Sequence, residues 1–146
     1  MKSTFITIII VTLYLTSLSL HAESICYKRG HTINVCDEAK KISNELSSRF
    51  PMKMSENIIA EKVAAYDNNV IISIFLNYDE KYLSEEARKG GVTISYLKAK
   101  MQAHMKNYIC TTNSKWFIEN GGQITYVYRF YDGVHFMDVV VDNCKN

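Results

Sequence analysis

The clearest fold signal in the chain is Gln123-Ile-Thr-Tyr-Val-Tyr-Arg-Phe-Tyr131-Asp132-Gly133-Val134-His-Phe-Met-Asp-Val-Val-Val-Asp142. Two runs rich in β-branched and aromatic residues flank the dipeptide Asp132-Gly133, which suits a two-residue type I′ turn. The stretch is therefore predicted to form a β-hairpin with strands Gln123–Tyr131 and Val134–Asp142. Such a turn also fixes the register, because it sets which residues stand opposite one another.

With Tyr131 opposite Val134, the hairpin divides into two faces. The face predicted to join the core holds Ile124, Tyr126, Tyr128, Phe130, His135, Met137, Val139 and Val141. Phe136 falls on the opposite face. There Arg129 and Asp138 are diagonal neighbours of opposite charge, so we predict that they pair.

A second hairpin is predicted earlier in the chain, with strands at 58–66 and 70–78. The runs flank Asp67-Asn68-Asn69, residue types that tolerate turn conformations. In the later run every second residue from Val70 to Tyr78 is apolar, which indicates one buried side. Two hairpins can join as one four-stranded antiparallel sheet.

Helical spacing of apolar residues occurs in three other places. A first helix follows a potential N-cap at Asp37 and ends at Pro51. A second runs over 93–110, and a short turn of helix is expected within 113–119. The segment 79–91 is assigned as a polar connection. The predicted fold class is therefore α+β, with two to three helices packed against the sheet.

The N-terminal residues 1–22 have the pattern of a secretory signal peptide. Lys2 precedes an apolar run from Phe5 to about Leu15, and Ala22 supplies a small residue before the cut. An uncleaved membrane anchor is the alternative, but the run is short of the ~20 residues that a span needs. We expect export, with a single mature domain at 23–146.

The residue after the expected cut is Glu23, whereas a lipid-modified protein would carry cysteine there. The mature protein is therefore expected to lack a stable membrane anchor. We predict a periplasmic location and leave onward secretion open. The formal net charge of +2 gives no reason to expect nucleic acid as a partner.

All four cysteines lie in the expected mature part, and an even number in an exported chain indicates two disulfides. Three pairings are possible. We favour Cys26–Cys36, which closes a local loop at 26–36, and Cys110–Cys144, which ties the middle of the chain to its end. The fold is thus predicted to be held by disulfides.

Sequence motifs of catalysis are absent: there is no His-Glu-x-x-His, Gly-x-Ser-x-Gly, phosphate-binding Gly-rich loop or Cys-x-x-Cys. We therefore assign no catalytic, cofactor-binding or metal-binding residue and predict that the protein is not an enzyme. His104 and His135 are read as partly buried, hydrogen-bonded residues, with a metal or acid–base pair as the alternative. A metal site at His31 would need reduced cysteines, which export disfavours.

A group of carboxylates and a group of aromatic side chains are further candidate sites. The carboxylates Asp79-Glu80 and Glu85-Glu86 are taken as a solvated loop rather than a catalytic pair. Trp116, Tyr126 and Tyr128 are taken as core aromatics, with a sugar- or peptide-binding face as the alternative.

The layout resembles the beta-type pilotins of bacterial type II secretion and their non-lipidated periplasmic relatives. The features are a helix ending at Phe50-Pro51-Met52, the strand Val70-Ile-Ile-Ser-Ile, the helix end Tyr108-Ile-Cys110, Ile124-Thr-Tyr-Val-Tyr128 after a Gly121-flanked turn, and Asp142-Asn-Cys144. Together they span about 37–144.

The resemblance implies a non-enzymatic helper that binds a segment of an outer-membrane secretin, with Cys110 and Cys144 as the family's disulfide. Those pilotins are lipoproteins, whereas this chain has Glu23 at its cut site. We therefore expect a soluble accessory role in an envelope secretion or type IV pilus system.

The alternative is a periplasmic inhibitor or immunity protein that blocks a toxin or lytic enzyme, with His31 at the tip of the 26–36 loop. A small hydrolase or sugar-binding protein is a third possibility.

Overall fold

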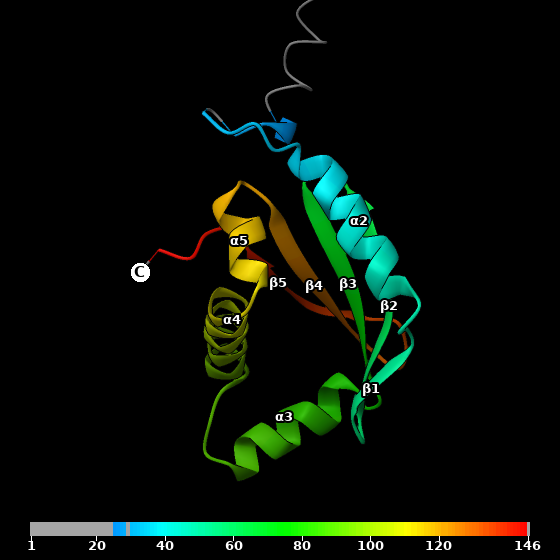
Figure 1. Ribbon diagram of the computed structural model, residues 1–146. Helices are drawn as coiled ribbons and strands as arrows, with labels where there is room; N and C mark the ends of the chain where they lie inside the picture. Colours follow the sequence, from blue (N-terminus) through cyan, green and yellow to red (C-terminus); the bar gives the residue numbers. More distant parts are fainter. Residues whose placement is uncertain (1–24, 29, 146) are drawn as a thin grey trace, which may run out of the picture.

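The computed structural model describes residues 25–28 and 30–145 and shows one β-sheet with helices packed on it (Figure 1). The elements are α2 (Val35–Ser47), β1 (Met52–Ser55), β2 (Ile58–Tyr66), β3 (Asn69–Leu76), α3 (Glu80–Lys89), α4 (Ile94–Thr111), α5 (Ser114–Glu119), β4 (Gln123–Phe130) and β5 (His135–Val141). The predicted signal segment 1–22 lies outside the described residues. The α+β class is confirmed.

The sheet has five strands in the order β1-β2-β3-β4-β5, and β3 pairs with β4 in parallel. The prediction of four antiparallel strands is therefore wrong in two respects. The segment 77–122 carries three helices from the end of β3 back to the start of β4, as a parallel pair requires. Alternating apolar residues look alike in both arrangements, so the pattern did not reveal the direction. The missed strand β1 has four exposed residues and no buried side.

Helix α3 occupies most of the segment that was assigned as a polar connection. Asp79 is its N-cap, and the Asp79 Oδ1 atom accepts a hydrogen bond of 2.7 Å from the backbone N–H of Tyr82. Ala87 is its one buried residue. Six of its ten residues are charged, which is why the sequence pattern indicated a polar connection instead of a helix.

The first and second predicted helices correspond to α2 and α4. The N-cap of α2 is Asn34 rather than Asp37, since Asn34 Oδ1 accepts from the backbone N–H groups of Cys36 and Asp37. Thr93 caps α4 in the same way through the N–H of Tyr96.

The core lies between one face of the sheet and the helices. Along β3 the residues Val70, Ile72, Ile74 and Leu76 are buried. In the parallel register they stand beside Ile124, Tyr126, Tyr128 and Phe130 of β4. Buried residues of α2, α4 and α5, such as Ala39, Ile109 and Phe117, belong to the same apolar cluster. The helices thus cover one face of the sheet.

The last hairpin has the predicted register from Ile124 to Tyr128 but not at its turn. Gly133 has φ +85°, whereas Asp132 does not have the positive φ that a type I′ turn demands. The backbone N–H of Gly133 donates to Phe130 O, and that of Phe130 donates to Val134 O, both at 2.9 Å. The loop is therefore a three-residue turn with a bulge at its base.

This bulge exchanges the faces of two residues. Phe136, predicted on the far face, is buried, and its ring centroid lies 5.1 Å from that of Phe130. His135, predicted in the core, is exposed. Its Nε2 atom is 2.8 Å from Asp138 Oδ1, so Asp138 pairs with His135 rather than with Arg129.

Candidate functional site

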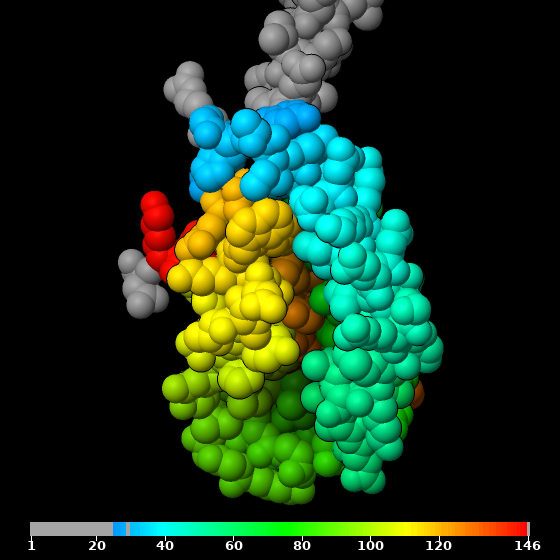
Figure 2. All heavy atoms as spheres, in the orientation of Figure 1, coloured from blue at the N-terminus to red at the C-terminus, as the bar shows by residue number. Residues whose placement is uncertain are grey.

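The helices cover different strands of the same face of the sheet. Helix α2 packs on β2 and β3, whereas α4 packs along β5. The space-filling view shows the surface hollowed between α2 on one side and α4 and α5 on the other, with strand atoms at the bottom (Figure 2). We call this depression the central groove; by their colour, the strand atoms at its bottom belong to β3 and β4.

Among the core-facing residues of β3 and β4, Ile72, Tyr126 and Tyr128 are the least deeply buried, and we therefore assign them to the floor of the groove. Ile72 keeps 9% of its surface exposed and Tyr126 keeps 7%, whereas Val70 keeps none. The flanking helices contribute half-buried apolar side chains that pack on the core: Ile42 from α2 and Met101 and Met105 from α4. The groove is therefore apolar at its floor and on both sides.

The tyrosine hydroxyls of the floor are held in their neutral form. Burial, followed by the nearby Tyr128 and Tyr108, raises the pKa of Tyr126 to about 12. Burial also raises the pKa of Tyr128, with Tyr78 adding to it. A floor of apolar surface and neutral hydroxyls suits the apolar side of a polypeptide segment that also offers a hydrogen-bonding group.

The candidate histidines do not form a joint site. His104 and His135 are both exposed, so the expectation that they are partly buried is wrong. His31 is exposed, and its Nδ1 atom lies 2.8 Å from Asn120 Oδ1. Among the residues that the structure describes, no three His, Cys, Asp or Glu side chains gather as a metal site.

The other two candidate groups are dispersed as well. Asp79 caps α3, and Glu86 pairs with Lys89 at 2.6 Å on the surface of that helix. Trp116 is exposed on α5, while Tyr126 and Tyr128 are buried in β4, so these rings do not present one surface.

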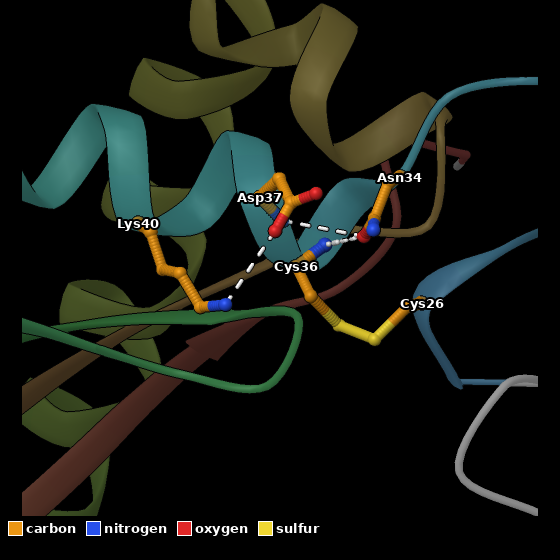
Figure 3. A network of polar contacts seen from close by, with 5 residues as sticks. All are labelled: Cys26, Asn34, Cys36, Asp37 and Lys40. Carbon is orange, nitrogen blue, oxygen red and sulfur yellow. Dashed lines mark hydrogen bonds and ion pairs between the residues drawn. A yellow bond between two sulfur atoms is a disulfide. The ribbon is translucent and has the colours of Figure 1, made fainter.

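In the structure, Cys26 is joined to Cys36 and Cys110 to Cys144, with Cα–Cα distances of 5.1 and 5.5 Å. The first bond closes a loop onto the start of α2, beside the Asn34 cap (Figure 3). The second joins the end of α4 to the tail that follows β5.

The 26–36 loop is fastened to the end of α5 and to the residue that follows it. Lys28 Nζ donates to the carbonyl oxygen of Glu119, and His31 contacts Asn120. A loop held at two points is a poor candidate for the free tip on which the inhibitor alternative depends.

No family model and no curated protein sequence matches the chain. Solved structures do. A protein from Pseudomonas aeruginosa that is inferred to be secreted superposes with a TM-score of 0.62 at 15% identity, over 76% of this chain and 93% of its own. The pilotin EpsS of the Vibrio vulnificus type II secretion system gives 0.57 at 14%, over 77% and 93%. The pilotin AspS of the Vibrio cholerae type II secretion system gives 0.53 at 13%, over 74% and 88%.

The chain has the pilotin fold. The resemblance inferred from scattered sequence features is confirmed at this level. The superpositions establish the fold alone, because identities of 13–15% leave function to be argued from the site. Within the described residues, no helix is both long and apolar enough to cross a membrane.

The central groove itself was not predicted. Ile72, Met101 and Met105 have the spacing of core residues, and they do pack on the core. They border a groove only because α2 and α4 cover different strands, and no local pattern in the sequence carries that information.

Proposed function

We propose that this protein is an exported, non-enzymatic accessory protein of an envelope secretion or type IV pilus system. It would act in the periplasm as a single domain, 23–146, after removal of the signal 1–22. Its partner would be a secretin or another assembly component. The fold shared with two type II secretion pilotins over about three quarters of the chain is the observation that carries this proposal.

The central groove is the best candidate for the partner's binding site. Its floor, built from Ile72, Tyr126 and Tyr128, is apolar with neutral hydroxyls, and half-buried apolar side chains lie on both sides. An amphipathic helix that enters such a groove can bury its apolar stripe there. The partner is therefore expected to contribute one short amphipathic segment rather than a folded domain.

A role without a lipid anchor follows from the expected cut before Glu23. The protein would then bind its partner from the soluble phase and would not carry it to a membrane through its own acyl chains. This separates it from lipoprotein pilotins and favours chaperoning or docking over sorting.

A pull-down from the envelope fraction tests the proposal. The full chain is expected to recover a secretin or pilus assembly protein, identified by mass spectrometry. Met105→Glu places a charge beside the groove, and we expect it to reduce recovery by about tenfold, because burying an unpaired charge is costly. Ala103→Glu puts the same side chain on an exposed position of α4 and serves as the control.

Both variants are first checked for folding by circular dichroism. An eluate from the wild-type chain that contains no secretin and no pilus component contradicts the proposed function. Equal recovery with Met105→Glu and Ala103→Glu contradicts the assignment of the groove while leaving the accessory role in place.

A further inference from the structure

A second concave site lies at the end of the sheet where β3 and β4 finish and α3 begins. It is a cavity of about 510 Å³ that opens to solvent. Its lining residues are Asn57, Asn77, Tyr78, Asp79, Tyr82 and Tyr131. They come from the β1–β2 turn, the β3–α3 connection, the first turn of α3 and the turn after β4. The sequence did not predict this cavity, because its four segments lie far apart in the chain and are brought together only by the fold.

The tyrosine rings present a large aromatic surface in this cavity. Tyr82 is 49% exposed and Tyr131 is 57% exposed. Tyr78 is half-buried between them and the core, with its ring centroid 5.6 Å from that of Tyr82 and 6.3 Å from that of Phe130. The half-buried ring of Tyr78 is therefore fixed by packing, and the exposed rings of Tyr82 and Tyr131 line the same cavity.

Three of the six lining residues, Asn77, Tyr82 and Tyr131, have their backbone N–H groups engaged in hydrogen bonds. The N–H of Asn77 donates to Asn57 O at 2.9 Å, and that of Tyr131 donates to Tyr78 O at 3.4 Å. Asp79 is fixed by its hydrogen bond to the N–H of Tyr82. The side-chain amides of Asn57 and Asn77 make no hydrogen bond to another residue that the structure describes.

The composition of the lining selects a class of ligand. No lysine or arginine lines the cavity, so nothing there would neutralise a phosphate or a carboxylate. No aliphatic side chain lines it either, so it lacks the apolar pocket that an acyl chain or a leucine-like anchor fills. What remains are aromatic faces, amides and hydroxyls, which both donate and accept hydrogen bonds, and the Asp79 carboxylate, which can only accept them.

We propose that this cavity is a binding subsite for a neutral glycan chain. The ring faces of Tyr82 and Tyr131 would pack against the C–H faces of pyranose units, and the amides of Asn57 and Asn77 would bond to sugar hydroxyls or acetamido groups. A sugar matches the site because each unit combines an apolar face with groups that donate and accept.

An extended peptide fits this site less well. Peptides that add to a sheet need a run of unpaired backbone groups, whereas the N–H groups of Asn77 and Tyr131 are already engaged. The inference goes beyond the proposed accessory function and does not depend on it, because the residues that carry it differ from those of the central groove.

Titration of the full ¹⁵N-labelled chain with chitotetraose, cellotetraose and maltotetraose, followed by NMR, tests the proposal. At least one of the three is expected to shift the backbone signals of residues 77–82 and 131, with a Kd on the order of 1 mM. Tyr82→Ala and Tyr131→Ala are each expected to weaken binding by roughly 2- to 12-fold, the loss of one aromatic contact.

Tyr82→Phe keeps the ring and should retain most of the binding. Tyr66→Ala removes a tyrosine that is 70% exposed on β2 and lies outside the cavity lining, so it serves as the matched control. The proposal is overturned if none of the three glycans shifts these signals, or if Tyr82→Ala and Tyr131→Ala bind as the wild type does. A tetraproline probe that shifts the same signals when the glycans do not would identify a peptide site instead. In the pull-down described above, the Tyr82→Ala variant should still recover a secretin or pilus component. Failure of the glycan site can then be distinguished from failure of the central groove.

Discussion

At the scale of single residues, the floor of the groove makes a prediction about alkaline pH. An unfolded tyrosine has a pKa near 10, whereas the pKa of Tyr126 is raised to about 12 in the folded protein by burial and by Tyr128 and Tyr108. The contribution of the Tyr126 hydroxyl to the free energy of unfolding is therefore complete below pH 10. It is lost as the pH rises toward 12, because the unfolded chain releases the proton first. The full loss corresponds to about 3 kcal/mol of unfolding free energy.

Tyr126→Phe removes this titration and supplies the control. Urea unfolding at pH 8 and pH 11 should show the wild type losing more unfolding free energy than the phenylalanine variant does. Equal losses would mean that the Tyr126 hydroxyl is ionised as easily in the folded protein as in the unfolded chain.

The turn at Gly133 shows what could be predicted at this scale. Asp132-Gly133 correctly indicated a hairpin, and the register holds from Ile124 to Tyr128. The choice between a two-residue and a three-residue loop depends on one φ angle. Burial of a phenylalanine side chain stabilises the fold more than burial of a histidine side chain does. Burial of Phe136 thus agrees with the bulged turn, a preference that the dipeptide Asp132-Gly133 does not itself encode.

At the scale of the elements, α4 covers the outer edge of the sheet. Lys98 Nζ donates to Phe136 O at 2.8 Å, and Gln102 Nε2 donates to Val140 O at 2.7 Å. One helical turn further on, Lys106 donates to the carbonyl oxygen of Lys145. These side chains occupy backbone acceptors on β5 and on the tail after it, acceptors that an edge strand would otherwise offer to another chain.

We therefore expect the double substitution Lys98→Ala with Gln102→Ala to expose this edge. Size-exclusion chromatography over a range of concentrations should show self-association of this variant. Lys100→Ala with His104→Ala changes two exposed positions of the same helix and should leave the elution volume unchanged. Elution of the first variant at the wild-type volume at every concentration would show that its edge needs no such cover.

The sequence pattern predicted most, but not all, of the helices and strands. The two long helices and four of the five strands were found, because their apolar residues recur at helical spacing or alternate along the strand. Helix α3 was missed because six of its ten residues are charged, and strand β1 was missed because all four of its residues are exposed. The direction of β4 relative to β3 depends on where three intervening helices pack, which alternation within a strand cannot reveal.

At the scale of the whole molecule, the two disulfides differ in what they hold. Cys26–Cys36 spans 10 residues and fastens an N-terminal loop, whereas Cys110–Cys144 spans 34 residues and joins α4 to the chain end. Chain entropy gives about 3 kcal/mol for the shorter loop and about 4 kcal/mol for the longer one. Cys110→Ala with Cys144→Ala should therefore lower the thermal midpoint more than Cys26→Ala with Cys36→Ala does.

Peptide mapping without reduction checks the pairing that this comparison assumes. Each of the two predicted cystine peptides should be recovered, and a peptide that links Cys26 to Cys110 or to Cys144 would contradict the pairing. A larger thermal loss from the Cys26 and Cys36 variant would instead show that the N-terminal loop contributes packing beyond its chain entropy.

The parallel neighbours β3 and β4 have a consequence for biosynthesis. Leu76 ends one strand and Gln123 begins the other, so a ribosome adding ~5–20 residues per second completes the second strand only seconds later. During that interval Val70-Ile-Ile-Ser-Ile-Phe-Leu76 is an uncharged, β-prone segment with one side unpaired. A newly made chain would thus be most prone to aggregate before its second half emerges, and a holding chaperone would be most useful at that stage.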